Sequence, residues 1–108
     1  MRKIAYLSMD VHARNIVMGD MDANGKYSGK RPFTPGENNI ISALKAVKAK
    51  LKYLIIEAGP LANWVAQTAN PYVTDVFICD PRQNALIHKA STKHDKLDAR
   101  KLCRLLRL

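Results

Sequence analysis

The chain has 108 residues, which is enough for one small domain. Hydrophobic residues make up 47% of it and charged residues 25%, which excludes a disordered chain, and no apolar run reaches the ~20 residues of a membrane-spanning helix. The 18 Lys and Arg outnumber the 9 Asp and Glu, giving a net charge of +9, so we expect a polyanionic partner, with nucleic acid well ahead of an anionic membrane surface.

Three strand-like segments open the chain. Residues 3–9 are apolar and rich in strand formers, and they end in Asp10. Residues 15–21 and 26–33 flank a turn that contains Asn24-Gly25, and Asn-Gly between strand-like runs predicts a hairpin. The first third of the chain therefore indicates an antiparallel meander.

A helix is predicted next, with its start near Thr34. This threonine can cap the free amides, a proline suits the first helical position, and Glu37 three residues further on completes a capping box. Apolar side chains then follow at helical spacing: Ile40, Leu44, Val47 and Leu51.

Strands and helices alternate after this point. Residues 52–56 form a short apolar strand that ends in Glu57, and residues 72–79 form a third apolar strand of this kind. Between them, four side chains give one packing face of a second predicted helix: Leu61, Trp64, Val65 and Thr68.

Two further helices are predicted in the last quarter of the chain. Asp80 followed by Pro81 has the pattern of an N-cap and a first-turn proline, which predicts a helix over 81–89. The segment from about Lys93 has the pattern of a strongly amphipathic helix.

This order of elements predicts an α/β fold with a mixed five-stranded sheet. The sheet is expected to be antiparallel on the meander side and parallel beyond it, with helices packed on it. Because the chain ends inside its last predicted helix, with no Gly or Pro to stop it, we expect residues 1–108 to be the N-terminal domain of a longer protein.

The last predicted helix, KHDKLDARKLCRLLRL, carries two acids among many basic residues. Residues three and four apart share a helix face, so Asp95 and Asp98 continue the apolar stripe and do not lie on the basic one. The apolar stripe contains Ala99, Leu102, Leu105 and Leu106, and the basic stripe contains Lys96, Arg100, Arg104 and Arg107.

Two more acids stand at strand ends, where they could join this pair. If the strands that end in Asp10 and Glu57 are parallel neighbours, both carboxylates emerge at one sheet edge, within reach of Asp95 and Asp98. Four converging carboxylates stay ionised only with cations, and Mg²⁺ or Mn²⁺ prefers such hard oxygen ligands. Two such ions ~3.5–4 Å apart activate a water or hydroxyl and stabilise the leaving oxygen of a phosphodiester.

Each of the four acids also has a structural alternative. Asp95 and Asp98 suit the positive end of a helix dipole, Asp10 suits a turn after a strand, and Glu57 suits the start of the next helix. The four acids together favour the metal site over these separate explanations. Three other aspartates are assigned to a helix cap or to the hairpin and left out of the site: Asp80, Asp20 and Asp22.

Other polar and aromatic residues in the sequence are also candidates for contacts with a nucleic acid near this site. His12 would contact a phosphate or a metal-bound water, or have no such role, and Trp64 is assigned to the core in preference to base stacking. Lysines 45, 48, 50 and 52 are expected to form a solvated face with weak affinity for phosphates. The side chains expected to guide a nucleic-acid backbone are Arg82, Lys89, Lys93, Lys96 and Arg100.

The two cysteines have no zinc-ligand spacing with each other or with the histidines. Cys79 and Cys103 are far apart and flanked by apolar residues. Buried, reduced thiols in a cytoplasmic protein are the preferred interpretation.

Four stretches of this sequence resemble the Asp-Glu-Asp-Asp (DEDD) transposases, the recombinases of the "one-ten" group of bacterial insertion sequences, which are related to pilin-gene inversion recombinases. The stretches are SMDVHA (8–13), IIEAGP (55–60), VFICDPR (76–82) and KHDKLDARKL (93–102). They run in order through nearly the whole chain and match the N-terminal domain of the family, which has a RuvC-like, RNase H-like fold.

The resemblance implies that Asp10, Glu57, Asp95 and Asp98 are the catalytic acids and hold Mg²⁺ in a nuclease-like site for DNA cleavage and exchange in transposition. It also implies a second domain with a serine nucleophile, DNA as substrate, a structured guide-like RNA from the element, a homo-oligomer and a place at the bacterial or archaeal nucleoid. Without the second domain, complete strand exchange is not expected of this chain.

Three other functions compete with a metal-dependent recombinase domain, and the weakest is a phosphate-accepting signalling domain with one strand-end Asp, which does not account for the pair Asp95 and Asp98. The first is a catalytically silent nucleic-acid-binding module with the same fold, which would use the basic stripe alone. The second is an actin-like or sugar-kinase-like ATPase, which needs glycine-rich phosphate loops that SMDVHA does not provide.

Overall fold

The computed structural model describes residues 1–80 and the strand 85–88. Within these residues the chain forms six strands, two α-helices and one 3₁₀ turn. In chain order they are β1 (Arg2–Val11), β2 (Ile16–Met21), β3 (Tyr27–Phe33), α1 (Glu37–Ala46), β4 (Ala49–Glu57), α2 (Ala62–Ala69), η1 (Asn70–Tyr72), β5 (Asp75–Asp80) and β6 (Ala85–His88).

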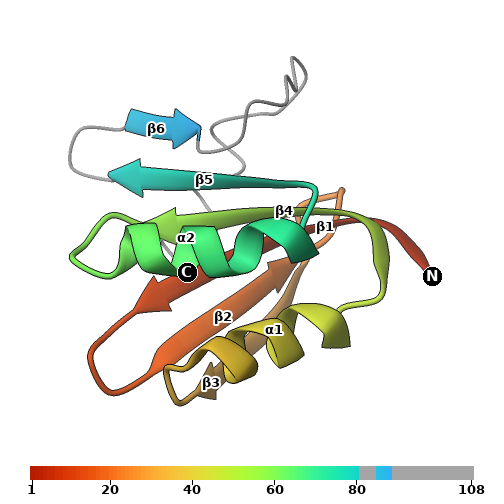
Figure 1. Cartoon of the computed structure of the whole chain (residues 1–108). Coiled ribbons are helices and arrows are strands. Elements are labelled where there is room, and N and C mark those ends of the chain that lie inside the picture. Colours follow the sequence, from red (N-terminus) through yellow and green to blue (C-terminus); the bar gives the residue numbers. More distant parts are fainter. Residues whose placement is uncertain (81–84, 89–108) are drawn as a thin grey trace.

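The strands form one mixed sheet in the order β3-β2-β1-β4-β5-β6 (Figure 1). Strands β1, β4 and β5 run parallel, whereas the β3-β2-β1 meander and the β5-β6 pair are antiparallel. This arrangement confirms the predicted α/β fold class, with an antiparallel meander followed by parallel strands. The five predicted strands are all present, and β6 adds a sixth.

The two faces of the sheet carry separate clusters of buried side chains. Both α1 and α2 pack on the larger cluster, which includes Leu7, Met9, Leu54, Ile56, Val76 and Ile78 from the three parallel strands. Side chains that alternate with these point to the opposite face and form the smaller cluster of Tyr6, Met21, Tyr53, Ile55, Phe77 and Cys79. Central parallel strands therefore read as almost continuous apolar runs because both of their faces are buried.

The predicted hairpin is confirmed between β2 and β3. Asp22 closes its turn, since the carboxylate accepts hydrogen bonds from the backbone amides of Asn24 at 2.9 Å and Lys26 at 2.8 Å. Gly25 has a φ of 87°, a conformation that side chains disfavour and that glycine adopts without strain. The Asn-Gly sequence thus forms the turn for the expected reason.

The start of α1 differs from the predicted capping box. The helix begins at Glu37 after Gly36, and no side chain caps its free amides. Thr34 instead accepts a hydrogen bond through its carbonyl from the Asn39 side chain, at 2.9 Å. The helix also ends at Ala46, so Leu51 lies in β4 and not on the predicted helix face.

The face of α2 was also predicted incorrectly in part. Small side chains form most of its buried face, namely Ala62, Val65, Ala66 and Ala69. Trp64, which was assigned to the core, is 40% exposed, and Leu61 before the helix is 39% exposed. Alanines allow the helix backbone to lie close to the sheet, and the large indole one position out of phase faces outward.

The predicted helix over 81–89 is wrong where the structure describes it. Residues 85–88 form β6, an edge strand whose register places Ala85 opposite Asp80 and His88 opposite Phe77. A short apolar run fits either a helix or a strand, and the free edge of β5 provides a partner for a strand. The final predicted helix, with Cys103, lies outside the described residues, whereas Cys79 is buried as expected.

No helix in the described part of the chain is both long and apolar enough to cross a membrane. This agrees with the absence of a spanning run in the sequence.

Candidate functional site

Two of the predicted acids stand side by side at the carboxyl edge of the sheet. Strands β1 and β4 are parallel neighbours, and their register pairs Met9 with Ile56, directly before Asp10 and Glu57. The next pair along the two strands is therefore the two acids themselves, on strands that lie ~4.8 Å apart. The predicted convergence of these two strand ends is confirmed.

Both acids also belong to the same face of the sheet. Side chains alternate along a strand, so Asp10 shares a face with Tyr6, and Glu57 shares a face with Tyr53. The rings of these tyrosines stack in the smaller cluster, with centroids 5.8 Å apart. The acids thus stand at the carboxyl end of an apolar layer, on the face opposite α1 and α2.

The electrostatics of the pair show that the two carboxyl groups interact directly. Burial raises the pKa of the Glu57 carboxyl above its usual range, and a hydrogen bond with Asp10 and the negative charge of Asp10 raise it further. Two carboxylates can share a hydrogen bond only when one of them holds a proton, because like charges at this distance repel. The site therefore needs a proton or a cation between the two groups.

His12 is the third polar side chain at this position. Its Nε2 lies 3.2 Å from Oδ2 of Asp10, and 59% of the histidine side chain and 47% of the aspartate side chain are exposed. The positive charge that His12 can carry lowers the pKa of Glu57, against the larger effects that raise it. The sequence leaves the role of His12 open, and in the structure its ring lies beside the Asp10 carboxylate.

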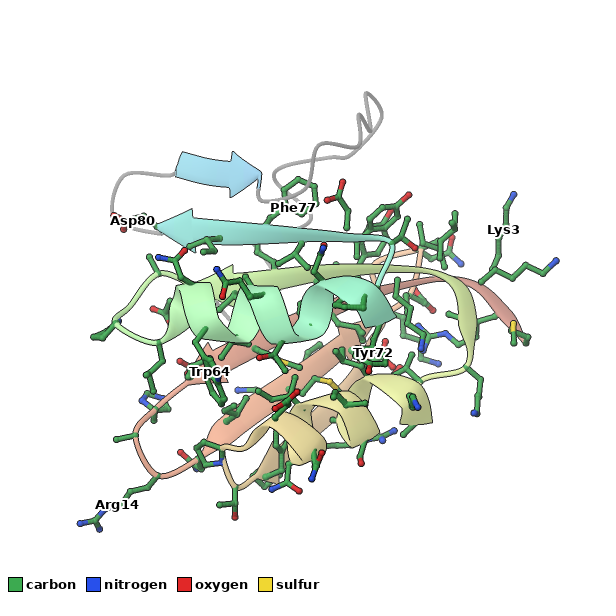
Figure 2. The ribbon with its side chains drawn as sticks, in the orientation of Figure 1. Lys3, Arg14, Trp64, Tyr72, Phe77 and Asp80 are labelled. Atoms are coloured by element: carbon green, nitrogen blue, oxygen red, sulfur yellow. The ribbon has the colours of Figure 1, made fainter. Side chains whose placement is uncertain are left out.

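The turn after β1 explains how His12 reaches back to Asp10. The His12 amide donates to the Asn15 carbonyl at 2.9 Å, which closes the short connection between β1 and β2. Figure 2 shows Arg14 of this connection at one end of β1, and Lys3 at the other. Because Asp10 and His12 are two residues apart in extended backbone, their side chains leave the strand on the same side.

Asp80 ends the third parallel strand at the same edge, as Figure 2 shows. It is in phase with Val76 and Ile78, which belong to the cluster under α1 and α2, and so it lies on the opposite face from Asp10 and Glu57. This position on the opposite face agrees with the prediction that Asp80 is not part of the site. Asp20 pairs with Arg2 at 2.7 Å, and Asp22 closes the hairpin turn, so neither is part of the site.

A close approach between strands lies directly behind the acids. Gly19 on β2 faces Ser8 on β1, and a Cβ at position 19 would lie 2.7 Å from Ser8 Oγ and 2.9 Å from the Tyr27 hydroxyl. Sequence reasoning did not single out these three residues. The only local signal was a glycine inside a strand, which marks a close approach of neighbouring groups.

The remaining predicted site residues lie outside the described residues. They are Asp95 and Asp98, and the basic residues Arg82, Lys89, Lys93, Lys96 and Arg100. Over the described ranges, no group of three or more His, Cys, Asp and Glu side chains is placed to hold a metal ion. The Asp10–Glu57 pair is thus the described part of the predicted four-acid site.

Comparison with known proteins supports the fold. No protein-family model matches the chain, and no curated protein matches its sequence. Among solved structures, the chain is similar to one described as T. thermophilus RuvC in complex with Holliday junction substrate, with a TM-score of 0.55 and 9% sequence identity. The match covers 75% of this chain and 67% of that chain, and it shows that this protein has a RuvC-like fold.

Proposed function

We propose that this chain is the metal-dependent DNA-processing domain of a transposase or site-specific recombinase. The observation that carries the proposal is the pair Asp10 and Glu57, two carboxyl groups in contact at adjacent ends of parallel strands. Two acids at such a position cost stability unless they bind a cation, and hard divalent ions suit carboxylate oxygens.

Asp95 and Asp98 complete the site in this proposal. Their helical phase places them on the apolar side of an amphipathic segment, as expected if that segment packs on the sheet. With Asp10 and Glu57 they would supply four carboxylates for two Mg²⁺ or Mn²⁺ ions. When bound, such a pair of ions lowers the pKa of a water and stabilises the negative charge that develops on a phosphodiester.

The residues of the chain have separate roles in this chemistry. Asp10 and Glu57 would hold the ions, and both acids stand at the ends of two buried, paired strands that keep their backbone positions rigid. His12, on Asp10 and largely exposed, is placed to donate a hydrogen bond to a phosphate oxygen. The basic residues between Arg82 and Arg100 would hold the DNA backbone beside the acids.

Two observations favour DNA as the substrate. The net charge of +9 suits a polyanion, and the RuvC structure that shares this fold is described as bound to a Holliday junction. The resemblance of the motifs to DEDD transposases adds the reaction class, with a serine in a further domain as the nucleophile. It also adds a structured RNA from the element and a homo-oligomer as partners.

A metal titration tests this function. Mg²⁺ or Mn²⁺ is expected to raise the melting temperature of the wild-type chain, because a ligand that binds only the folded state stabilises it by mass action, by about 2.7 kcal/mol at about 100 times its Kd. The variant Asp10→Asn is expected to lose this metal-dependent shift. Differential scanning fluorimetry, with and without EDTA, measures it.

Asp80→Asn is the matched control, since Asp80 lies at the same sheet edge on the opposite face. It should keep the full metal-dependent shift. An equal shift in wild type and Asp10→Asn would contradict the metal site. Absence of any shift in wild type, together with salt-sensitive DNA binding, would instead support the silent nucleic-acid-binding module.

A further inference from the structure

The amino edge of the sheet, at the other end of β4, carries a polar pocket that the proposed function does not use. Its volume is about 340 Å³, and it is lined by Ala49, Lys50 and Lys52 from β4 and by residues 71–74 between α2 and β5. Figure 2 shows Tyr72 at the opposite end of α2 from Trp64. We name this hollow the amino-edge pocket.

Two lysines line the amino-edge pocket, Lys50 and Lys52, and with the adjoining Lys45 and Lys48 they form what we call the lysine patch. The Nζ of Lys45 lies 5.5 Å from the centroid of the Tyr72 ring, a cation–π distance that holds this lysine beside the pocket. Lys48 and Lys50 are exposed. Two lysines thus line the pocket, and two more from α1 and the segment before β4 lie next to them.

Lys52 is the fixed member of the lysine patch. Its Nζ donates to the carbonyl of Leu44 near the end of α1, at 2.7 Å, and its backbone amide donates to Oγ1 of Thr74 at 2.9 Å. Burial lowers the pKa of Lys52, and the positive charge of Lys48 lowers it further. An anion in the pocket would relieve this repulsion between neighbouring lysines.

Two acids at this end of the described sheet, Asp75 and Asp20, are held elsewhere. Asp75 is fully buried, and it belongs to the opposite face with Phe77 and Cys79. Its carboxylate accepts a hydrogen bond from the amide of Val76, at 3.0 Å. Asp20 accepts hydrogen bonds from the two terminal guanidinium nitrogens of Arg2, at 2.7 and 3.0 Å. The positive charge of the lysine patch is therefore available to an external anion.

The position of the lysine patch relative to the acids limits what can bind there. Strand β4 has 9 residues between the two edges, a length of roughly 26 Å at ~3.3 Å per residue. The acids lie on one face of the sheet, whereas the Lys52 ammonium lies against α1 on the other. One straight duplex lying on the acid face would not reach the lysine patch.

We propose that the lysine patch and the amino-edge pocket bind the phosphate backbone of a second nucleic-acid segment, separate from any segment at the acids. The charges repeat over a surface rather than forming one enclosed socket, which suits a chain of phosphates better than a single small anion. The inference goes beyond the proposed function, because it requires neither metal nor cleavage.

A charge-matched pair of double variants tests the site. Lys48→Gln/Lys50→Gln removes two exposed lysines of the patch, and Lys26→Gln/Lys30→Gln removes two exposed lysines of the hairpin. Binding of a fluorescent duplex of about two helical turns is measured by anisotropy across a salt series, in EDTA so that no metal contributes. The first variant should bind at least about fivefold more weakly and lower the salt slope by about 1–2, and the second should change affinity by less than about twofold.

Lysine acetylation footprinting gives a second measurement on the wild-type chain. Bound duplex should protect Lys48 and Lys50 from a water-soluble acetylating reagent and leave Lys26 and Lys30 modified. The same experiment with inorganic phosphate, at an equal phosphate concentration, should give little protection. Protection by inorganic phosphate as strong as that by DNA would show a small-anion site and overturn the proposal.

Equal weakening of DNA binding by both double variants would also overturn it, since that result needs only the overall charge of the chain. The metal-dependent melting shift separates this inference from the proposed function. Lys48→Gln/Lys50→Gln should keep the metal-dependent melting shift. Asp10→Asn should lose this shift and still bind DNA at the lysine patch.

Discussion

The two edges of the central sheet have opposite charge and opposite effects on stability. At the carboxyl edge, burial and the neighbouring Asp10 raise the pKa of Glu57, so keeping Glu57 ionised there costs stability. At the amino edge, Lys52 also has a like charge beside it, but its ammonium holds the last turn of α1 through the Leu44 carbonyl. Like charges beside each other thus lower stability at the carboxyl edge, whereas at the amino edge the hydrogen bond from Lys52 to the Leu44 carbonyl offsets this effect.

This difference follows from what each side chain can reach. A short carboxylate at a strand end reaches only the groups close to it, here the neighbouring acid and, for Asp10, the His12 ring, so a further partner such as a cation comes from outside. A lysine has a long flexible stem and can find a backbone carbonyl several ångströms away. The carboxyl edge is therefore the place where binding energy can be gained, and four substitutions distinguish the two edges.

The largest effect is expected behind the acids. Gly19→Ala should lower the free energy of unfolding by about 1–3 kcal/mol, because its Cβ would lie 2.7 Å from Ser8 Oγ and 2.9 Å from the Tyr27 hydroxyl. Urea unfolding followed by circular dichroism measures the change. Gly59→Ala is the control, since nothing lies within 4 Å of a Cβ there. Equal losses in the two variants would show that the close packing at Gly19 does not constrain the fold.

At the amino edge, Lys52→Met should lower the free energy of unfolding by about 1–2 kcal/mol. It removes a charged hydrogen bond of 2.7 Å to the Leu44 carbonyl, and the half-buried position reduces the loss. The matched variant Lys50→Met, at an exposed lysine two residues earlier on the same strand, should change stability little. If Lys52→Met proved as stable as wild type, the amino edge would not be stabilised in the way described.

At the carboxyl edge, replacing an acid should raise the stability of the chain at neutral pH rather than lower it. Because the pKa of Glu57 is raised in the folded chain, its contribution to stability is complete below its ordinary pKa near 4.5 and is lost as pH rises through the raised value. Glu57→Gln should therefore be more stable than wild type at neutral pH in EDTA, and this advantage should disappear as the pH falls to about 4. Thermal unfolding over this pH range measures the difference.

Glu37→Gln is the control for the same chemical change, because Glu37 is exposed in the first turn of α1. It should gain no stability at neutral pH. A Glu57→Gln variant that is less stable than wild type at every pH would contradict the repulsion at the carboxyl edge.

The smallest effect is expected from the ion pair of the amino edge. Arg2→Gln removes both hydrogen bonds to Asp20, at 2.7 and 3.0 Å, in a pair that is partly exposed. Such pairs contribute about 0.2–1 kcal/mol, and less at high salt. Melting temperatures at low and high salt, with Lys3→Gln as the control, measure this contribution. A loss that does not shrink with salt would show that packing of the arginine matters more than its charge.

Local patterns in the sequence predicted the strands and the hairpin because each depends on a few neighbouring residues. The apolar runs of β1, β4 and β5 and the Asn24-Gly25 turn are examples. The pairing of Asp10 with Glu57 was also predictable, since a helix between two strands favours a parallel pair whose carboxyl ends meet at one edge.

The misses have a common physical cause. Residues 85–88 form a strand because the edge of β5 offers hydrogen bonds, and a local pattern does not contain that partner. Trp64 faces outward because the close packing of α2 on the sheet selects its alanines. Thr34 does not cap α1, since the helix begins at Glu37 with Gly36 at its N-cap position, two residues after Thr34.

By itself, the sequence determined the order of the elements as far as β5, the mixed sheet and the two acids at neighbouring strand ends. Tertiary structure alone decided that Asp10 and Glu57 share the face opposite α1 and α2, that His12 lies beside Asp10, and that Lys50 and Lys52 line a pocket at the other edge. Composition and periodicity act along the chain, whereas the charge that one residue feels depends on which distant residues the sheet brings beside it.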